Sequence, residues 1–173
     1  MHDGHIYLLI GPKGSGKSFI GKLIDTQFDI RFLRVEDWVK NLSPQSAAME
    51  DESYLEAVFY EIEHGVRREL KKASPVVFES TGLTTYFDEM FARLSRDFRM
   101  TTIGVRADPV CCLERVKSRD QSIHIDIPID TVKAINDQVL EKNMKTDYIV
   151  QNNEANLESL KARLKKIIEQ RHL

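Results

Sequence analysis

Residues 11–18 read Gly-Pro-Lys-Gly-Ser-Gly-Lys-Ser, a combination of residue types and spacing that suits the binding of a phosphate chain. Glycines let successive backbone N–H groups turn inward around an anion, and the N-terminus of a following helix adds partial positive charge. Lys17 is then placed to reach the β- and γ-phosphates of a nucleoside triphosphate, and the Ser18 hydroxyl to enter the shell of a Mg²⁺ ion. We therefore expect Mg-ATP to contact Gly11, Pro12, Lys13, Gly14, Ser15, Gly16, Lys17 and Ser18.

An acidic residue, Glu79, ends the apolar run Pro75-Val-Val-Phe-Glu79. Phosphate loops of this kind usually work with an acid on a neighbouring strand, which holds Mg²⁺ directly or through water. Glu79 is the candidate for that role, although aspartate is the more usual residue. The alternative is an ordinary strand-end carboxylate that stabilises the Ser-Thr-Gly turn of residues 80–82.

Two further acids, Glu36 and Asp37, follow the apolar segment 30–35, whose expected place in a sheet brings them beside the phosphate loop. A carboxylate there can orient an acceptor hydroxyl and accept its proton during phosphoryl transfer. Of the two neighbours we favour Asp37. The alternative is a solvated helix N-terminus, where the helix dipole favours acids whatever their function. Arg34, just before them, is placed either to contact an anionic acceptor or to pair with these acids.

Arg115 and Arg119 lie four residues apart, at the end of an expected helix and before a polar segment with few apolar residues. We expect residues 117–130 to form a small mobile lid. Cations that fold over a transferring phosphoryl group stabilise its developing charge and help to exclude water. The alternative is a solvated basic helix end, which the helix dipole also favours. Beside a phosphate loop, we expect at least one of the two arginines to act on phosphate.

The elements that must hold these residues alternate between strands and helices. Stretches of helical periodicity separate short apolar runs, which predict five strands at residues 6–10, 30–35, 75–79, 100–106 and 147–150. This alternation requires crossover connections and hence an α/β fold with a mostly parallel sheet, helices on both faces and the candidate residues at one sheet edge. A strand before the phosphate loop and a helix after it argue against a chance match in a glycine-rich turn. The length of 173 residues suits one such domain, residues 1–173.

The composition argues against several classes of function. A net charge of −2 and a pI near 6.2 lack the basic excess of a dedicated nucleic-acid binder, so we expect no nucleic-acid partner. No apolar run approaches the roughly 20 residues that cross a bilayer, and no signal-peptide pattern is seen, so we expect a cytoplasmic protein without a membrane partner. Cys111 and Cys112 are adjacent, which suits neither a disulfide between them nor a metal site. Monomer and homodimer both remain open.

Taken together, these features resemble the nucleotide-kinase-like branch of the P-loop NTPases. The resemblance rests on the Walker A loop of residues 11–18, the acids at 36 and 37, Glu79-Ser-Thr-Gly82, the arginine segment and Asp147-Tyr-Ile-Val-Gln-Asn152. That branch includes adenylate, shikimate and gluconate kinases and ATP-dependent polynucleotide kinases. The resemblance covers nearly the whole chain and implies a three-layer fold with a five-stranded sheet of order 2-3-1-4-5 and a mobile lid. It also implies that Gln151 and Asn152 border the adenine.

The leading hypothesis is an ATP-dependent phosphotransferase whose acceptor is a small metabolite or nucleotide. The Asp-x-Asp and Gly-Gly-Gly signatures of shikimate kinases are missing, as is the acceptor pattern of adenylate kinases, so the acceptor is not identified. One alternative is a regulatory nucleotide-binding module without a phosphoryl acceptor, in which the acids at 36 and 37 would be dispensable. Another is a polynucleotide-end kinase, which would need a basic acceptor groove.

Overall fold

The computed structural model describes residues 4–40, 42, 52–119, 127–153 and 156–170. Five strands form one sheet of order β2-β3-β1-β4-β5, and every pair of neighbours runs parallel. This order confirms the expected topology. The strands are β1 (His5–Ile10), β2 (Arg31–Phe32), β3 (Val76–Ser80), β4 (Arg99–Arg106) and β5 (Tyr148–Gln151).

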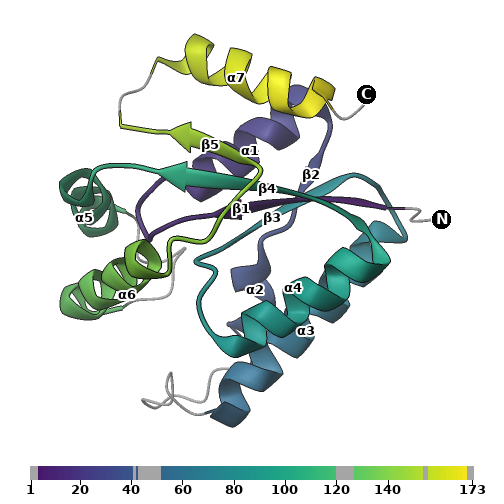
Figure 1. Ribbon diagram of the computed structural model, residues 1–173, viewed down its shortest axis with the longest axis horizontal. Helices are drawn as coiled ribbons and strands as arrows, with labels where there is room; N and C mark the ends of the chain where they lie inside the picture. Colours follow the sequence, from purple (N-terminus) through teal and green to yellow (C-terminus); the bar gives the residue numbers. More distant parts are fainter. Residues whose placement is uncertain (1–3, 41, 43–51, 120–126, 154–155, 171–173) are drawn as a thin grey trace.

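Helices cover both faces of the sheet (Figure 1). In this view α1 and α7 lie above the sheet and α2, α3 and α4 lie below it, while α5 and α6 stand at the edge toward which β4 and β5 point. The helices are α1 (Lys17–Phe28), α2 (Val35–Val39), α3 (Glu52–Leu70), α4 (Thr85–Asp97), α5 (Pro109–Ser118), α6 (Ile129–Lys142) and α7 (Leu157–Glu169).

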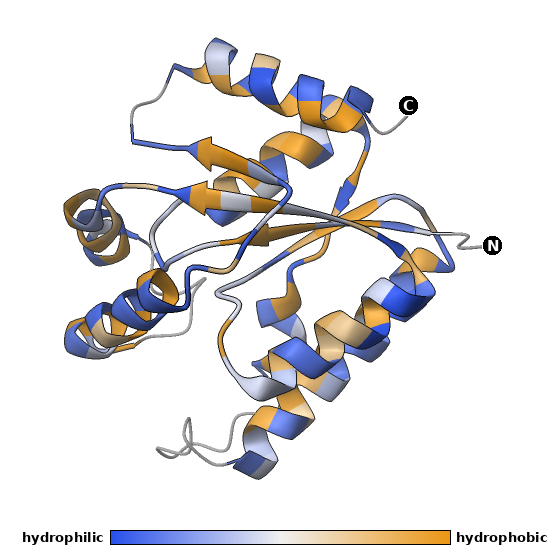
Figure 2. Cartoon of the chain, in the orientation of Figure 1, coloured by the Kyte–Doolittle hydropathy of each residue, from blue (hydrophilic) through white to orange (hydrophobic). Residues whose placement is uncertain are grey.

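The alternation of side chains along β1 divides the core into two layers. Ile6, Leu8 and Ile10 join an apolar cluster with residues of α2, α3 and α4. Tyr7 and Leu9 point to the opposite face and join a second cluster with residues of α1 and α7. A central strand buried on both faces needs apolar residues at every position, which explains its continuous apolar run. Figure 2 shows largely hydrophobic strands between helices that carry both hydrophobic and hydrophilic residues.

The second strand is shorter than the predicted segment 30–35. Regular pairing covers only Arg31 and Phe32, and one further bond joins the Leu33 N–H to the Val77 carbonyl at 2.8 Å. The chain then turns, and Val35 opens helix α2. Val35 and Val39 are both buried, so a helical turn and not an extended strand brings these apolar side chains into the core.

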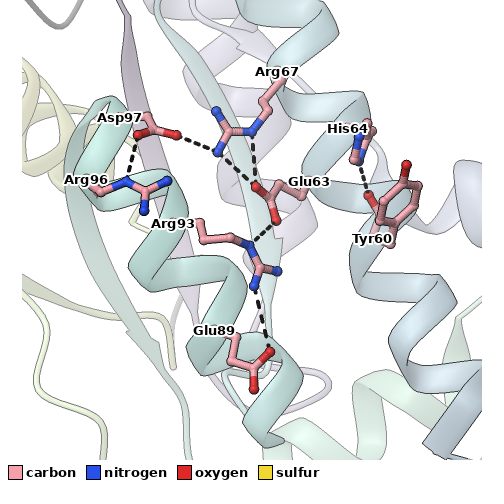
Figure 3. A network of polar contacts seen from close by, with 8 residues as sticks. All are labelled: Tyr60, Glu63, His64, Arg67, Glu89, Arg93, Arg96 and Asp97. Atoms are coloured by element: carbon pink, nitrogen blue, oxygen red, sulfur yellow. Dashed lines mark hydrogen bonds and ion pairs between the residues drawn. The ribbon is translucent and has the colours of Figure 1, made fainter.

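Helices α3 and α4 are joined by an ionic network (Figure 3). The Glu63 carboxylate, only 8% exposed, accepts hydrogen bonds from Arg67 at 2.8 Å and from Arg93 at 2.8 Å. Arg67 also pairs with Asp97 at 2.7 Å. Each oxygen of the buried Glu63 carboxylate thus has a guanidinium partner, and the network fixes the two helices side by side.

Three other expectations concern the cysteines, the membrane and the lid. Cys111 and Cys112 are both free cysteines, and Cys112 is buried. Among the described residues, no helix is both long and apolar enough to cross a membrane. The predicted lid, residues 117–130, falls partly on residues 120–126, which lie outside the described ranges.

Candidate active site

The phosphate loop connects β1 to α1, as its flanking pattern predicted. Gly14 and Gly16 have φ angles of 83° and 93°, in the left-handed region that favours glycine. A Cβ atom at Gly14 would also lie 2.1 Å from the Cys112 carbonyl oxygen, so the loop packs directly against the start of α5. Both positions require glycine for the backbone turn, and Gly14 also for the contact with α5; a Cβ atom at Gly16 would instead lie 2.1 Å from Nδ2 of Asn152.

The N-terminus of α1 leaves donors available for an anion. Gly16 is the N-cap and provides no side-chain cap, and the first turn contains no acidic residue. The first N–H groups of any helix lack an intrahelical acceptor and carry the positive end of the helix dipole. The local structure at Lys17 and Ser18 is thus that of an anion-binding helix end.

Lys17 is buried, and its side chain folds back across the loop. Its ammonium donates to the carbonyl oxygens of Gly11 and Pro12, both at 2.9 Å. Burial lowers the pKa of Lys17 to about 8, and the charge of Glu79 partly opposes this shift. An anionic ligand would favour the charged form of this lysine, so the site is electrostatically prepared for phosphate.

Ser18 and Glu79 meet at the base of the loop. The Ser18 hydroxyl donates to Glu79 Oε1 at 2.8 Å. The second oxygen, Glu79 Oε2, is buried and has no hydrogen-bond partner among the described residues. Mg²⁺ prefers hard oxygen ligands and is usually held by one or two protein groups together with phosphates and water. A hydroxyl beside a carboxylate with an unused buried oxygen fits that requirement.

Of the two acids in the first turn of α2, the structure brings Glu36 and not Asp37 toward this pair. Glu36 lines a small cavity of about 90 Å³, together with Ser18, Lys22, Phe32, Arg34, Val35 and Glu79. The Asp37 side chain is 48% exposed and pairs with Arg34 at 3.3 Å and with Lys40 at 3.5 Å. Adjacent helical residues point in directions about 100° apart, which explains why only one of the two reaches the cavity.

A larger cavity of about 260 Å³ lies at the ends of β1 and β4, beside the turn that follows β3, and extends to the C-terminal half of α6. Its charged lining residues are Arg106, Asp108 and Lys142. The Lys142 ammonium donates to the Gly82 carbonyl at 2.7 Å and to Asp88 at 2.8 Å. The cavity also reaches Gly11 and Pro12, whose carbonyl oxygens hold the Lys17 ammonium.

Arg115 and Asn152 both contact the outer side of the phosphate loop. The Arg115 guanidinium donates to the carbonyl oxygens of Asn152 at 2.7 Å and Gly14 at 3.4 Å. The Asn152 side chain donates to the Ser15 carbonyl at 2.8 Å. These bonds connect α5 and the end of β5 to the middle of the loop.

The other predicted residues have different surroundings. Arg119 directly follows α5, and its charge contributes to lowering the pKa of Lys13, after the larger effect of burial. The exposed Gln151 lines the larger cavity. The structure therefore gathers the loop, Glu36, Glu79 and both arginines around one end of the sheet, while Asp37 faces solvent.

Sequence reasoning missed two polar residues of α6. Asn136 is only 8% exposed and bonds to the backbone of Lys13, and Lys142 lines the larger cavity. Asn136 does carry a sequence signal, because its spacing from Val132 and Val139 places an amide on the apolar face of the helix. Lys142 has no comparable signal, since a basic residue in the last turn of a helix is ordinary.

Comparisons with known proteins agree with this geometry. A family model described as an AAA domain matches residues 6–141. The shikimate kinase of Bacteroides thetaiotaomicron superposes with a TM-score of 0.67 at 18% identity, over 96% of this chain and 98% of that one. The APS kinase of Mycobacterium tuberculosis, in complex with AMPPNP and APS, gives 0.64 at 10% identity, over 96% and 98%. No curated protein matches the chain.

A third match is part of a larger assembly. A chain of an RNA repair complex of Pnkp1, Rnl and Hen1 superposes with a TM-score of 0.64 at 18% identity, over 84% of this chain and 48% of that one. At such identities the matches show a shared fold. With the family match, they confirm the resemblance to the nucleotide-kinase-like P-loop proteins that the sequence indicated.

Proposed function

Because this chain belongs to the AAA domain family, we propose that it is an ATP-dependent phosphotransferase that moves the γ-phosphoryl group of Mg-ATP to a hydroxyl group of a small molecule. The observation that carries the proposal is the hydrogen bond of 2.8 Å between Ser18 and Glu79, beside the buried Lys17 and across a small cavity from Glu36. The nucleotide-binding residues thus lie beside Glu36, an acid that could receive the proton of an acceptor hydroxyl. A module that only binds nucleotide does not need such an acid.

Each residue has a chemical role in this proposal. The open N-terminus of α1 and the Lys17 ammonium hold the phosphate chain. Ser18 and Glu79 are the residues that would hold Mg²⁺, which when bound neutralises charge on the phosphate oxygens. Glu36 orients the acceptor hydroxyl and takes its proton as the new bond to phosphorus forms.

Arg119 is our candidate for the cation that acts on the transferring group, and we assign Arg115 to positioning the loop. Arg115 is given the positioning role because its guanidinium donates to carbonyl oxygens of Gly14, Asn152 and Asn153. Arg119 is given the other role because it follows α5 and its charge acts on Lys13 of the phosphate loop. We place the reacting hydroxyl in the small cavity at Glu36. The rest of the acceptor extends toward Thr81 and Gly82, where the larger cavity begins.

An acceptor screen tests the proposal in two stages. Thermal melting with a non-hydrolysable ATP analogue, then with added metabolites, identifies compounds that bind the native state and raise its melting point. Compounds that stabilise the protein are next assayed for ADP formation. A 5′-hydroxyl oligonucleotide is included in the screen. If only this compound is turned over, the proposed acceptor is a polynucleotide end and not a small molecule.

The paired variants Glu36→Gln and Asp37→Asn separate the two neighbouring acids. Glu36→Gln removes the proposed base and should lower kcat by about 100-fold or more, within the usual range for loss of general base catalysis. Asp37→Asn is the matched control, because it removes one charge at the next residue outside the cavity, and it should keep kcat within about threefold, as an exposed substitution does. Full activity of Glu36→Gln would refute the assignment of the base.

A further inference from the structure

The side chain of Asn136 makes two hydrogen bonds with one residue of the phosphate loop. Its Oδ1 accepts from the Lys13 N–H at 2.7 Å, and its Nδ2 donates to the Lys13 carbonyl at 3.0 Å. Asn136 belongs to α6, more than a hundred positions further along the chain, and is 8% exposed. A buried amide is costly unless both its donor and its acceptor are paired, and here Lys13 pairs both.

These bonds define what Lys13 can contribute to the site. Because its N–H is bonded to α6, the main chain of Lys13 adds no donor to the anion-binding hollow. Its contribution is therefore the ammonium group. The residues on either side further restrict the backbone conformation at Lys13, because Pro12 has a restricted φ and Gly14 lies in the left-handed region.

The Lys13 ammonium has no hydrogen bond or ion pair with any residue in the described part of the chain, although the residue is half-buried. Burial lowers its pKa, Glu36 and Glu79 act in the opposite direction, and Arg119 adds to the lowering. The charge of Lys13 in turn lowers the pKa of Lys17. Two ammonium groups thus act on each other at one loop, an arrangement that a polyanionic ligand would stabilise.

We propose that Lys13 is a second catalytic lysine, which contacts the γ-phosphoryl group of ATP, and that Asn136 is the positioning residue that holds it there. The proposal rests on the proposed function, because it assigns Lys13 to the phosphoryl group that is transferred. Lys17 then serves the phosphate chain from the first turn of α1, and Lys13 approaches the terminal group from the loop. A lysine can make such a contact as a point charge from a flexible side chain.

The ratio of ATP to ADP affinity tests the role of Lys13 without an acceptor. ADP lacks the γ-phosphoryl group. Lys13→Met should therefore lower the affinity for ATP by about tenfold, as for the loss of one charge-assisted contact, and change the affinity for ADP by no more than about twofold. Lys133→Met, which removes an exposed lysine of α6, is the control and should change neither affinity. Isothermal titration calorimetry of both nucleotides gives the ratio. An unchanged ratio in Lys13→Met would overturn the proposal.

A double-mutant cycle tests Asn136. Asn136→Ala should lower the ATP-to-ADP ratio by about threefold in the native background and have little further effect in Lys13→Met, since its action passes through Lys13. Gln138→Ala, at an exposed position of α6, is the matched control. An equal effect of Asn136→Ala in both backgrounds would show a general role in folding and contradict the assignment. The two proposals can also fail separately. If Lys13→Met changes the ratio of ATP to ADP affinity as expected, but the wild-type protein never transfers the phosphoryl group, the proposed function fails while the Lys13 contact stands.

Discussion

At the scale of single residues, the site depends on charges that are buried before any ligand arrives. The pKa of Lys17 is lowered from its ordinary value to about 8, chiefly by burial. In the free protein this lysine therefore loses its proton as the pH rises through about 8. When a phosphate chain is bound, its negative charge stabilises the ammonium, and Lys17 keeps its proton to higher pH. Binding of ATP is thus linked to proton uptake near this pH, and affinity must fall on the alkaline side.

The expected size of this effect follows from the pKa. If only the charged Lys17 binds, the affinity for ATP should fall by about tenfold between pH 7 and pH 9. Phosphate groups, whose second pKa is about 6, change their own charge only slightly over this range. Calorimetric titrations in buffers of different ionisation enthalpy measure both the affinity and the protons taken up. Lys17→Arg stays charged over this range and is the control. An affinity of the native protein that does not change between these two pH values would contradict the role of Lys17.

At the scale of elements, the strands and the phosphate loop were predictable because their signals are local. Continuous apolar runs and the loop's glycine spacing indicate β1, β3 and α1 without knowledge of the rest. Tertiary contacts decided the remaining features. Val35 becomes helical because α2 buries it, and Glu36 replaces Asp37 in the cavity because that helix fixes their directions. Asn136 and Lys13 pair only after the chain between them has folded.

The pairing of α3 with α4 gives a prediction for stability. Glu63→Ala would leave Arg67 and Arg93 without their shared buried carboxylate, although both retain an acidic neighbour, Asp97 or Glu89. We expect a loss of about 2 kcal/mol in the free energy of unfolding, typical of hydrogen bonds to charged groups. Urea unfolding followed by circular dichroism measures it. Glu56→Ala, at an exposed position of α3, should stay within about 0.5 kcal/mol. Equal effects of the two variants would rule out a special contribution of Glu63.

At the scale of the whole molecule, the parallel sheet explains why residues from distant segments form one site. All five strands point the same way, so the loop after β1, Glu79 near the end of β3 and the residues after β4 and β5 meet at a single edge (Figure 1). The helices α5 and α6 stand at that edge and contact the loop through Arg115 and Asn136. The same architecture is seen in kinases of very different sequence, which leaves the acceptor to be identified by its chemistry.

The central claim is that this edge transfers a phosphoryl group and does not merely bind or hydrolyse ATP. The most direct measurement uses ATP labelled in its γ-phosphoryl group, together with an acceptor found by thermal melting, and follows the label by mass spectrometry. The label should appear covalently on the acceptor, in an amount equal to the ADP formed, and Glu36→Gln should lower its rate by about 100-fold. Label recovered only as inorganic phosphate, with or without acceptor, would contradict the account.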